Sequence, residues 1–305
     1  MKFTIYQESR IGQRKSNQDR IAYCYSRDAV LLVLADGMGG HLHGEVAAQI
    51  AVQFITEAFQ REARPLLPDP FMFLSKCLGN AHNAVLDYAL ERDLPDAPRT
   101  TCVACIIQDN IAYWAHAGDS RLYLVREGQV FAQTRDHSRV QMMIDDGVLT
   151  EEEALQHPGR NRVYSCLGGA MPPQIDFSRK MLLQAGDVIV LCSDGFWVPL
   201  GNDALAAGFS GADVIAKTPE LMNRAEELAG PTGDNLSVIA MSWEEGYGDA
   251  PTTRGSVETA TMPLSAHTTQ MEGMDKNRAR DTELTDEDIE QAIAEIQNAI
   301  HKYSK

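Results

Sequence analysis

The sequence predicts an α+β fold in which two antiparallel β-sheets pack face to face with helices outside them. Three observations indicate it: an unbroken apolar run, two long amphipathic stretches after it, and a series of short strand-like segments separated by tight turns. Strands in consecutive hairpins form antiparallel sheets, and helices in pairs form outer layers. The chain of 305 residues, 44% of them hydrophobic, has the composition that a large core needs.

A buried strand is expected at residues 29–35, because the run AVLLVLA contains no polar residue. Such a run is typical of a strand covered on both faces. Two helices are expected next, at residues 44–61 and 70–91, where apolar side chains recur every three or four positions. Each helix can therefore bury one face.

The middle of the chain is predicted to form a meander of strands. The pairs Asp109-Asn110 and Glu127-Gly128 are expected to form tight turns between neighbouring strands. A second buried strand is expected at residues 187–192, followed by two helical stretches. The other strands are expected at residues 100–108, 111–117, 121–126, 129–133 and 237–243.

Charge and composition exclude some classes of partner. The net charge of −16 argues against nucleic acid or an anionic membrane as the main partner, since both require basic patches. The first residues lack the apolar stretch of a signal peptide, and no apolar run approaches the ~20 residues that span a bilayer. We therefore expect a cytoplasmic protein.

Six cysteines lie mostly in apolar stretches, without the spacing of a disulfide framework. Cys102 and Cys105 form an isolated C-x-x-C within a strand-like run. No second pair follows at the spacing of a zinc finger. We interpret these two residues as buried side chains of a strand rather than as a zinc or redox site.

The composition changes near residue 245 and predicts three parts. Residues 1–244 are expected to form one domain, and residues 245–282, without apolar periodicity, a flexible linker. Residues 283–305 are expected to form an amphipathic helix, with Thr285 as its N-cap and a narrow stripe of isoleucines. Because so short a helix is marginal alone in water, it should dock either on its own domain or on a protein partner.

Aspartates recur beside glycines at the ends of strand-like runs. Asp36-Gly37 and Asp194-Gly195 each follow a buried strand, Gly233-Asp234 precedes the last strand, and Gly118-Asp119 lies between two strands. Asp19 begins another strand-like stretch. A single Asp-Gly pair is an ordinary turn, but the recurrence of these corners indicates a shared site. Carboxylate and carbonyl oxygens are the ligands that Mg²⁺ and Mn²⁺ prefer.

Arg14 adds a group of opposite charge five residues before Asp19. A guanidinium presents a planar fork that binds tetrahedral oxyanions in a bidentate manner. Alone, Arg14 would be an ordinary surface arginine in the pair Arg14-Lys15. Beside a cluster of metal-binding carboxylates, it indicates a phosphate site.

These motifs, in this order, resemble a known family. The segments R-K-S-N-Q-D, D-G-M-G-G-H-x-x-G-E, G-D-S-R, S-D-G and G-D-N are similar to those of the bacterial branch of the metal-dependent protein phosphatases, the type 2C Ser/Thr phosphatase family. Residues 136–168 also resemble the flap segment of that family. The resemblance covers residues 1–243.

The resemblance implies a four-layer αββα sandwich with a binuclear metal centre in the cleft between the sheets. It implies two Mn²⁺ or Mg²⁺ ions and a weaker third. Asp36 would bridge the two ions, with the carbonyl of Gly37 as a further ligand, and Arg14 would bind the substrate phosphate. The other ligands implied are Asp19, Asp194 and Asp234 for the main pair and Asp119 for the third ion.

The implied function is metal-dependent hydrolysis of phosphoserine and phosphothreonine in proteins, opposing Ser/Thr kinases. Family members commonly carry an acid four residues after the S-D-G aspartate, where this chain has Val198. Two alternatives stay open. The chain could be a catalytically weak module that binds phosphoproteins, or a different metallohydrolase acting on small phosphoesters.

Overall fold

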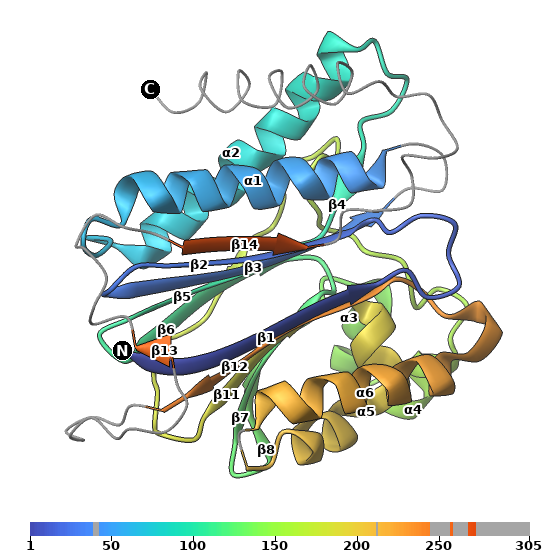
Figure 1. Cartoon of the computed structure of the whole chain (residues 1–305). Helices are drawn as coiled ribbons and strands as arrows, with labels where there is room; N and C mark the ends of the chain where they lie inside the picture. Colours follow the sequence, from blue (N-terminus) through green and yellow to red (C-terminus); the bar gives the residue numbers. More distant parts are fainter. Residues whose placement is uncertain (39–42, 212, 245–256, 259–267, 273–305) are drawn as a thin grey trace.

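A computed structural model describes residues 1–38, 43–211, 213–244, 257–258 and 268–272 (Figure 1). Two β-sheets pack face to face in the middle of the molecule. Helices α1 and α2 cover the outer face of one sheet, and α5 and α6 cover the outer face of the other (Figure 1). The predicted α+β sandwich is thus confirmed.

The first sheet has the strand order β13-β1-β12-β11-β7-β8. Each neighbouring pair is antiparallel. Its strands are β1 (Lys2–Arg10), β7 (Arg121–Arg126), β8 (Gln129–Gln133), β11 (Val188–Cys192), β12 (Leu236–Trp243) and β13 (Val257–Glu258).

The second sheet has the order β10-β6-β5-β3-β2-β14, with β4 paired to β3 and β9 to β6. Its neighbours are also antiparallel. Its strands are β2 (Asp19–Tyr25), β3 (Ala29–Met38), β4 (Arg99–Thr100), β5 (Cys102–Gln108), β6 (Ile111–Ala117), β9 (Asp176–Phe177), β10 (Met181–Leu182) and β14 (Thr268–Glu272).

Among the described residues, four long helices form the outer layers, and two short helices lie in a separate segment of the chain. The short helices α3 and α4 lie between β8 and β9, in the segment that resembles a flap. Their N-caps are Ser138 and Thr150, whose side chains accept backbone N–H groups of the first turn. The helices are α1 (Gly44–Glu62), α2 (Pro70–Glu91), α3 (Arg139–Asp145), α4 (Glu151–Gln156), α5 (Asp194–Gly208), α6 (Val214–Ala229) and the 3₁₀ turn η1 (Gly230–Thr232).

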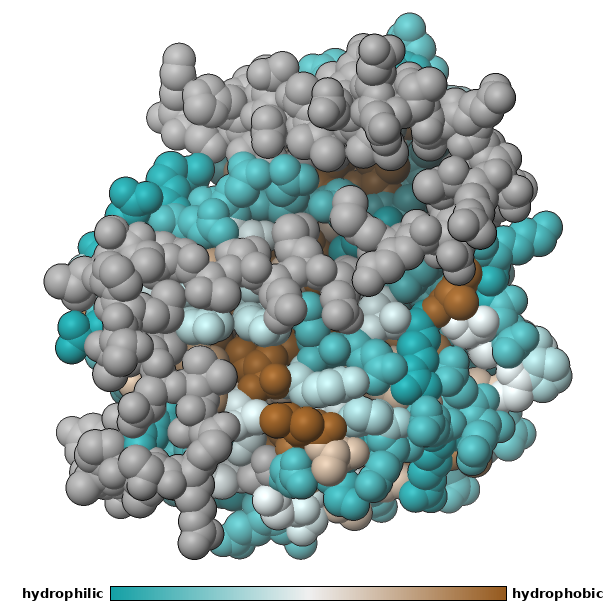
Figure 2. Space-filling view, in the orientation of Figure 1, coloured by the Kyte–Doolittle hydropathy of each residue, from teal (hydrophilic) through white to brown (hydrophobic). Residues whose placement is uncertain are grey.

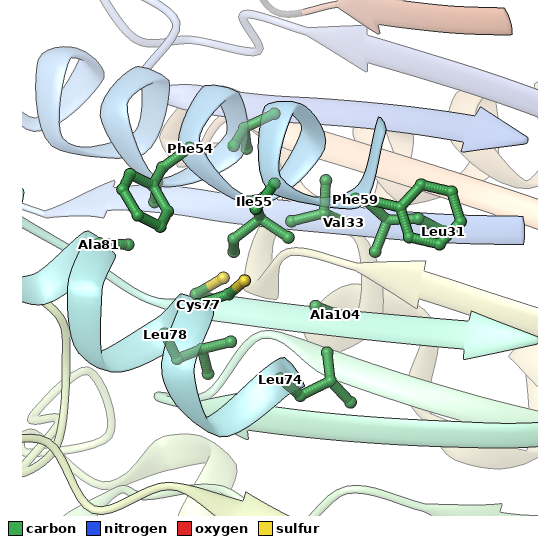
Figure 3. Packing of buried hydrophobic residues seen from close by; sticks show 14 of the residues in the cluster. Leu31, Val33, Phe54, Ile55, Phe59, Leu74, Cys77, Leu78, Ala81 and Ala104 are labelled. Atoms are coloured by element: carbon green, nitrogen blue, oxygen red, sulfur yellow. The ribbon is translucent and has the colours of Figure 1, made fainter. Parts of the chain in front are cut away.

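The apolar residues of β3 show how one strand supports two cores. Leu31 and Val33 face helices α1 and α2, in the layer drawn in Figure 3. Leu32 and Leu34 face the other sheet, in the core between the sheets. Alternate side chains of a strand point to opposite faces. A strand buried on both faces therefore reads as the continuous apolar run seen in the sequence.

The tight turns also agree with their sequence. Asp109 and Asn110 both have positive φ, and so do Glu127 and Gly128. Two-residue hairpins with this backbone conformation match the right-handed twist of the strands that they join. The first turn joins the antiparallel pair β5 and β6 in one sheet, and the second joins the antiparallel pair β7 and β8 in the other.

Some elements differ from expectation. Strand β1 was not expected, because its sequence is largely polar; it is fixed by pairing with β12 along eight residue pairs. Within residues 245–282, expected as a flexible linker, β13 pairs with β1 and β14 with β2. The chain is paired rather than free at these two strands. The expected helix at residues 283–305 lies outside the described residues.

Cys102 and Cys105 are fully buried on β5, and all six cysteines are free. They are core side chains, as the sequence predicted. No helix among the described residues has the length and apolar character to cross a membrane. Where residues are coloured, the face in Figure 2 is mostly hydrophilic, with small apolar patches.

Candidate metal centre and active site

The predicted aspartates meet because the ends of their strands meet. Asp19 begins β2 and lies directly opposite Asp36, near the end of β3. In the other sheet, Asp194 follows β11 and Asp234 precedes β12, which pairs with β11. Asp119 lies in the turn between β6 and β7.

A cavity of about 700 Å³ collects these groups. It is lined by Arg14, Asp36, Asp119, Asp194 and Asp234 among others, and we call it the carboxylate cleft. Asp19 is fully buried beside it. The structure therefore brings together every side chain that the sequence singled out for the site, together with Gly37 in the lining.

Hydrogen bonds join the two sheets at this site. The Ser193 hydroxyl donates to Asp19 Oδ2 over 2.8 Å and accepts from the backbone N–H of Ser237 over 2.9 Å. Asp19 belongs to one sheet. Ser193 directly follows strand β11 of the other sheet, and Ser237 lies on strand β12 of that sheet. Ser193 thus fixes the position of Asp19 across the sandwich, a role that the sequence did not indicate beyond its place in the S-D-G motif.

Asn235 holds the loop that carries Arg14. Its Oδ1 accepts the backbone N–H of Gln18 over 2.9 Å. Its Nδ2 donates to the carbonyls of Ile11 and Ser16 over 2.8 and 3.0 Å. This one buried amide ties both ends of the segment containing Arg14 to the start of β12.

The glycines after Asp36 and Asp194 are required by close packing. A Cβ on Gly37 would lie 2.3 Å from the carbonyl oxygen of Gly44, and one on Gly195 would lie 2.1 Å from that of Asn235. Neither glycine has positive φ. An Asp-Gly pair is typical of a turn, but the main role of these two glycines is to let another backbone segment approach.

Burial and mutual repulsion raise the pKa of these carboxyls. Burial raises the pKa of Asp19 to about 6, with the charge of Asp234 adding to the rise. The pKa of Asp119 rises to about 7, mainly through burial. Burial and then neighbouring aspartates raise the pKa of Asp36 and Asp194 well above the usual range. Burial and like charges thus disfavour the charged form of these carboxyls, which a bound cation would favour.

The donor chemistry fits a hard divalent cation, although the side chains do not form a closed ligand set. Asp19 Oδ1 is buried without a hydrogen-bond partner, as expected of an oxygen reserved for a cation. Among the described residues, however, no three His, Cys, Asp or Glu side chains are placed so that they could hold a metal ion. The carboxylates act on one another across the cleft, and cation binding would have to draw them closer.

Arg14 lies at the open side of the cleft. Its side chain is 54% exposed and donates from Nη2 to Asp234 Oδ2 over 2.5 Å. This hydrogen bond raises the pKa of Arg14, and the charges of Asp194 and Asp36 raise it further. The guanidinium is therefore accessible to a ligand while it remains beside the carboxylates.

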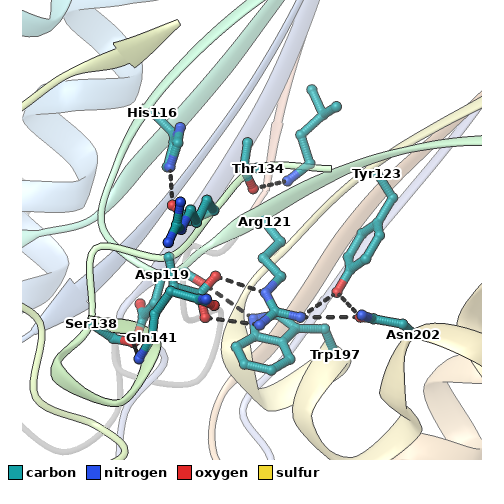
Figure 4. A network of polar contacts seen from close by, with 12 residues as sticks. His116, Asp119, Arg121, Tyr123, Thr134, Ser138, Gln141, Trp197 and Asn202 are labelled. Atoms are coloured by element: carbon teal, nitrogen blue, oxygen red, sulfur yellow. Dashed lines mark hydrogen bonds and ion pairs between the residues drawn. The ribbon is translucent and has the colours of Figure 1, made fainter. Parts of the chain in front are cut away.

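A second polar network, centred on Arg121, was not foreseen in the sequence (Figure 4). Arg121 donates from Nε and Nη2 to the two oxygens of Asp136, over 2.8 and 2.9 Å. Its guanidinium stacks 3.4 Å above the Trp197 ring, and Trp197 Nε1 donates to the carbonyl of Asp119 over 3.0 Å. The network connects the start of the flap segment, α5 and the turn that carries Asp119. Arg121 lies in the G-D-S-R motif and Asp136 begins the segment that resembles a flap, which was the available signal, whereas Trp197 lies in neither.

Val198 places an apolar group at the site. It is half-buried on α5 and lines a cavity of about 320 Å³ with Arg14, Asp194 and Asp234. No carboxylate is available from this position for a third cation. Gly39, Gly40 and His41 lie outside the described residues.

Comparison with known proteins identifies the family. A family model described as protein phosphatase 2C matches residues 6–229. The chain belongs to the protein phosphatase 2C family. It is thus a protein phosphatase by class, and the resemblance read from its motifs is confirmed.

Several bacterial members of the protein phosphatase 2C family are similar to this chain. A protein of Streptococcus pyogenes, described as protein phosphatase 2C-type, is 31% identical over 231 residues, covering 75% of this chain and 92% of the relative. The serine/threonine protein phosphatase PstP of Mycobacterium tuberculosis is 32% identical over 228 residues, which are 74% of this chain but only 42% of PstP.

Solved structures agree with the fold. The serine/threonine phosphatase of S. agalactiae superposes with a TM-score of 0.72 at 30% identity, covering 79% of this chain and all of that one. The catalytic domain of PstP, solved in complex with two manganese ions, gives a TM-score of 0.67 at 28% identity, covering 80% of this chain and 99% of that one.

Proposed function

We propose that the protein hydrolyses phosphoserine and phosphothreonine in proteins, in a metal-dependent reaction that opposes Ser/Thr kinases. The observation that carries this proposal is the convergence of Arg14 with Asp19, Asp36, Asp194 and Asp234 at the ends of strands from both sheets. Membership of the protein phosphatase 2C family supports it. So do relatives that are described as serine/threonine phosphatases.

The cleft would hold two Mn²⁺ or Mg²⁺ ions and a weaker third. Asp36 would serve both main ions, Gly37 would offer its carbonyl as a further ligand, and Asp194 and Asp234 would hold the first ion. Asp19 would serve the same cluster. Asp119 would hold the third ion, for which Val198 offers no ligand. Bound cations of this kind lower the pKa of water and stabilise charge on a phosphoryl group, which is the chemistry that hydrolysis of a phosphomonoester requires.

The side chains of the protein would bind and orient the substrate. Arg14 presents a guanidinium fork to two phosphate oxygens, because its side chain is open to solvent on one side and held near the carboxylates on the other. A phosphate would displace Asp234 from Arg14 and leave that carboxylate free. Asn235 keeps the Arg14 loop in register with β12 and so positions the fork.

A second candidate is a phosphoprotein-binding module with weak turnover. The apolar Val198 at the cleft favours it, as does the lack, among the described residues, of three acidic, His or Cys groups placed to hold an ion. Against it stands the full set of carboxylates around the cleft.

The test is phosphate release from a phosphothreonine peptide with Mn²⁺, Mg²⁺ or EDTA. We expect turnover that needs metal and falls on the order of 100-fold or more in Asp194→Asn. The matched control, Asp96→Asn, changes an exposed carboxylate in the loop between α2 and β4 and should retain activity. Metal-dependent release from p-nitrophenyl phosphate but from no phosphopeptide would favour a small-molecule phosphoesterase. Phosphopeptide binding without release would favour the binding module.

We further propose that the protein works in the cytoplasm with a cognate Ser/Thr kinase. Six free cysteines fit a reducing compartment. The C-terminal segment 283–305 would dock on its own domain or on a protein partner, as its isoleucine stripe indicates.

A further inference from the structure

A second cavity, of about 480 Å³, opens beside the carboxylate cleft and is here called the side pocket. It shares Asp119 and Asp194 with the cleft. Most of the rest of its wall comes from the flap helices α3 and α4 on one side and from α5 on the other, with Arg121 of β7 and Gln133 of β8 among the further lining residues. A substrate whose phosphate lies in the cleft would therefore place a neighbouring residue at the side pocket.

One wall of the side pocket is held in place before any ligand arrives. Arg121 forms two hydrogen bonds to Asp136, stacks on Trp197, and donates to Asn202 Oδ1 over 3.1 Å (Figure 4). All four residues line the pocket. The Arg121 and Asp136 charges compensate each other, so neither is available to a ligand without breaking the network.

The remaining surface of the side pocket combines apolar walls with exposed acids that form no ion pair among the described residues. Ile144 from α3, Ala154 from α4 and Val198 from α5 line it. Glu151 and Asp203, one on each side, are exposed lining residues. Arg160 also lines the pocket and donates to the carbonyl of Leu155 over 3.1 Å. The two acids outnumber this cation, so the accessible charge of the pocket is negative.

We propose that the side pocket receives a basic side chain, Lys or Arg, that flanks the phosphorylated residue of the substrate. The methylene stem would lie against Val198 and Ile144, and the cationic head would reach Glu151 and Asp203. Lys and Arg combine an apolar stem with a charged head and suit a pocket of this composition. The net charge of −16 favours the approach of such substrates. This inference rests on the proposed function and specifies its substrate class.

The experiment compares matched phosphothreonine peptides that carry Lys, Leu, Glu or Ala at each flanking position in turn. The readout is the ratio of kcat/KM for the Lys peptide to that for the Ala peptide, measured with Mn²⁺ and the full chain. We expect one position at which this ratio reaches about threefold to tenfold, as for an ion pair near a protein surface. High salt should reduce it.

The double variant Glu151→Gln/Asp203→Asn should bring that ratio close to one. The control Glu152→Gln/Glu227→Gln removes the same charge from exposed positions outside the pocket and should leave the ratio unchanged. A preference for Leu at every position, or no preference, overturns the inference. So does a Lys preference that persists in the double variant. Lack of activity on the Ala peptide itself would instead count against the proposed function.

Discussion

The carboxylate cleft and the side pocket share Asp119 and Asp194, yet they are built in different ways. The cleft lies at strand ends, where glycines allow backbone segments to touch and Ser193 bridges the two sheets. The side pocket lies mainly between helices, and its acids Glu151 and Asp203 are exposed. The cleft depends on close backbone contacts, and few substitutions at its glycines would preserve them. The charge of the pocket depends on exposed side chains, which can be replaced without disturbing the fold.

The difference indicates a division of work. Phosphoryl transfer requires fixed donors, so its groups belong on the rigid ends of strands. Selection among substrates requires only that the free energy of binding differ from one substrate to another. Exposed side chains on helices can supply this difference.

The largest effect is expected from Gly195→Ala. Its new Cβ would lie 2.1 Å from the Asn235 carbonyl, so the backbone around Asp194 and Asp234 must shift. We expect a loss of about 1–3 kcal/mol in the free energy of unfolding, together with most of the activity. Urea unfolding measures the first effect. Gly79→Ala, within α2 and with open space around its Cβ, should instead stabilise by about 0.5–1 kcal/mol. Equal urea midpoints for Gly195→Ala and wild type would refute the close-packing account.

Ser193→Ala should be the next most severe change. It leaves Asp19 Oδ2 without its hydroxyl donor and the Ser237 N–H without that acceptor, both in buried surroundings. The expected cost is about 1–3 kcal/mol of stability and a Mn²⁺ affinity about 10- to 100-fold weaker. Urea unfolding and Mn²⁺ titration measure the two effects, with Ser75→Ala on α2 as control. Unchanged Mn²⁺ affinity would show that Asp19 does not need the bridge between the sheets.

Arg14→Ala tests the open side of the cleft. Because a charge-assisted contact to phosphate would be lost, kcat/KM for a phosphothreonine peptide should fall about 10- to 100-fold. Stability should change little, since the Arg14 side chain is half exposed. Arg179→Ala, in the loop between β9 and β10, is the matched control. A variant that retains the wild-type kcat/KM would remove Arg14 from the site.

The smallest effect is expected from two buried histidines, which make the stability of the fold depend on pH. Burial lowers the pKa of His82, whose Nδ1 accepts the Gly168 N–H, and the pKa of His116 is lowered by burial as well. At these two sites the unfolded chain binds more protons than the folded chain, whereas the buried aspartates of the cleft act in the opposite direction. The stability that the histidines contribute should be fully present above the usual histidine pKa of about 6.5 and be lost as pH falls below it. The wild-type urea midpoint minus that of His82→Gln, measured at several pH values, isolates the contribution of His82 and should fall on acidification. A difference that stays constant or grows on acidification would contradict this.

Much of the fold could be read from the sequence, because one physical signal dominates there. Strand β3 is apolar on both faces, and helix α2 has a Pro at N1 and the Asp69 cap before it. The strand ends that follow such runs placed Asp36 and Asp194 correctly. Strand β1 was not predicted because most of its residues are polar and half-buried, and its pairing with β12 is what fixes it.

The parts of the site that could not be predicted depend on contacts between distant segments. Ser193 and Asp19 are 174 residues apart, and no local sequence pattern predicts their hydrogen bond. The stacking of Arg121 on Trp197 likewise needs the packing of α5 against the first sheet. Nor does the sequence show that Gly37 and Gly195 serve close approach rather than a turn.

The most direct test of the central proposal is calorimetric titration of the full chain with Mn²⁺, beside Asp36→Asn. The strand-end carboxylates are proposed to form one shared metal centre, so the wild type should bind two ions. The variant should bind them at least about tenfold more weakly, because it loses a carboxylate that would serve both ions. A folded wild type that binds no Mn²⁺, or a variant that binds it as the wild type does, would contradict the account.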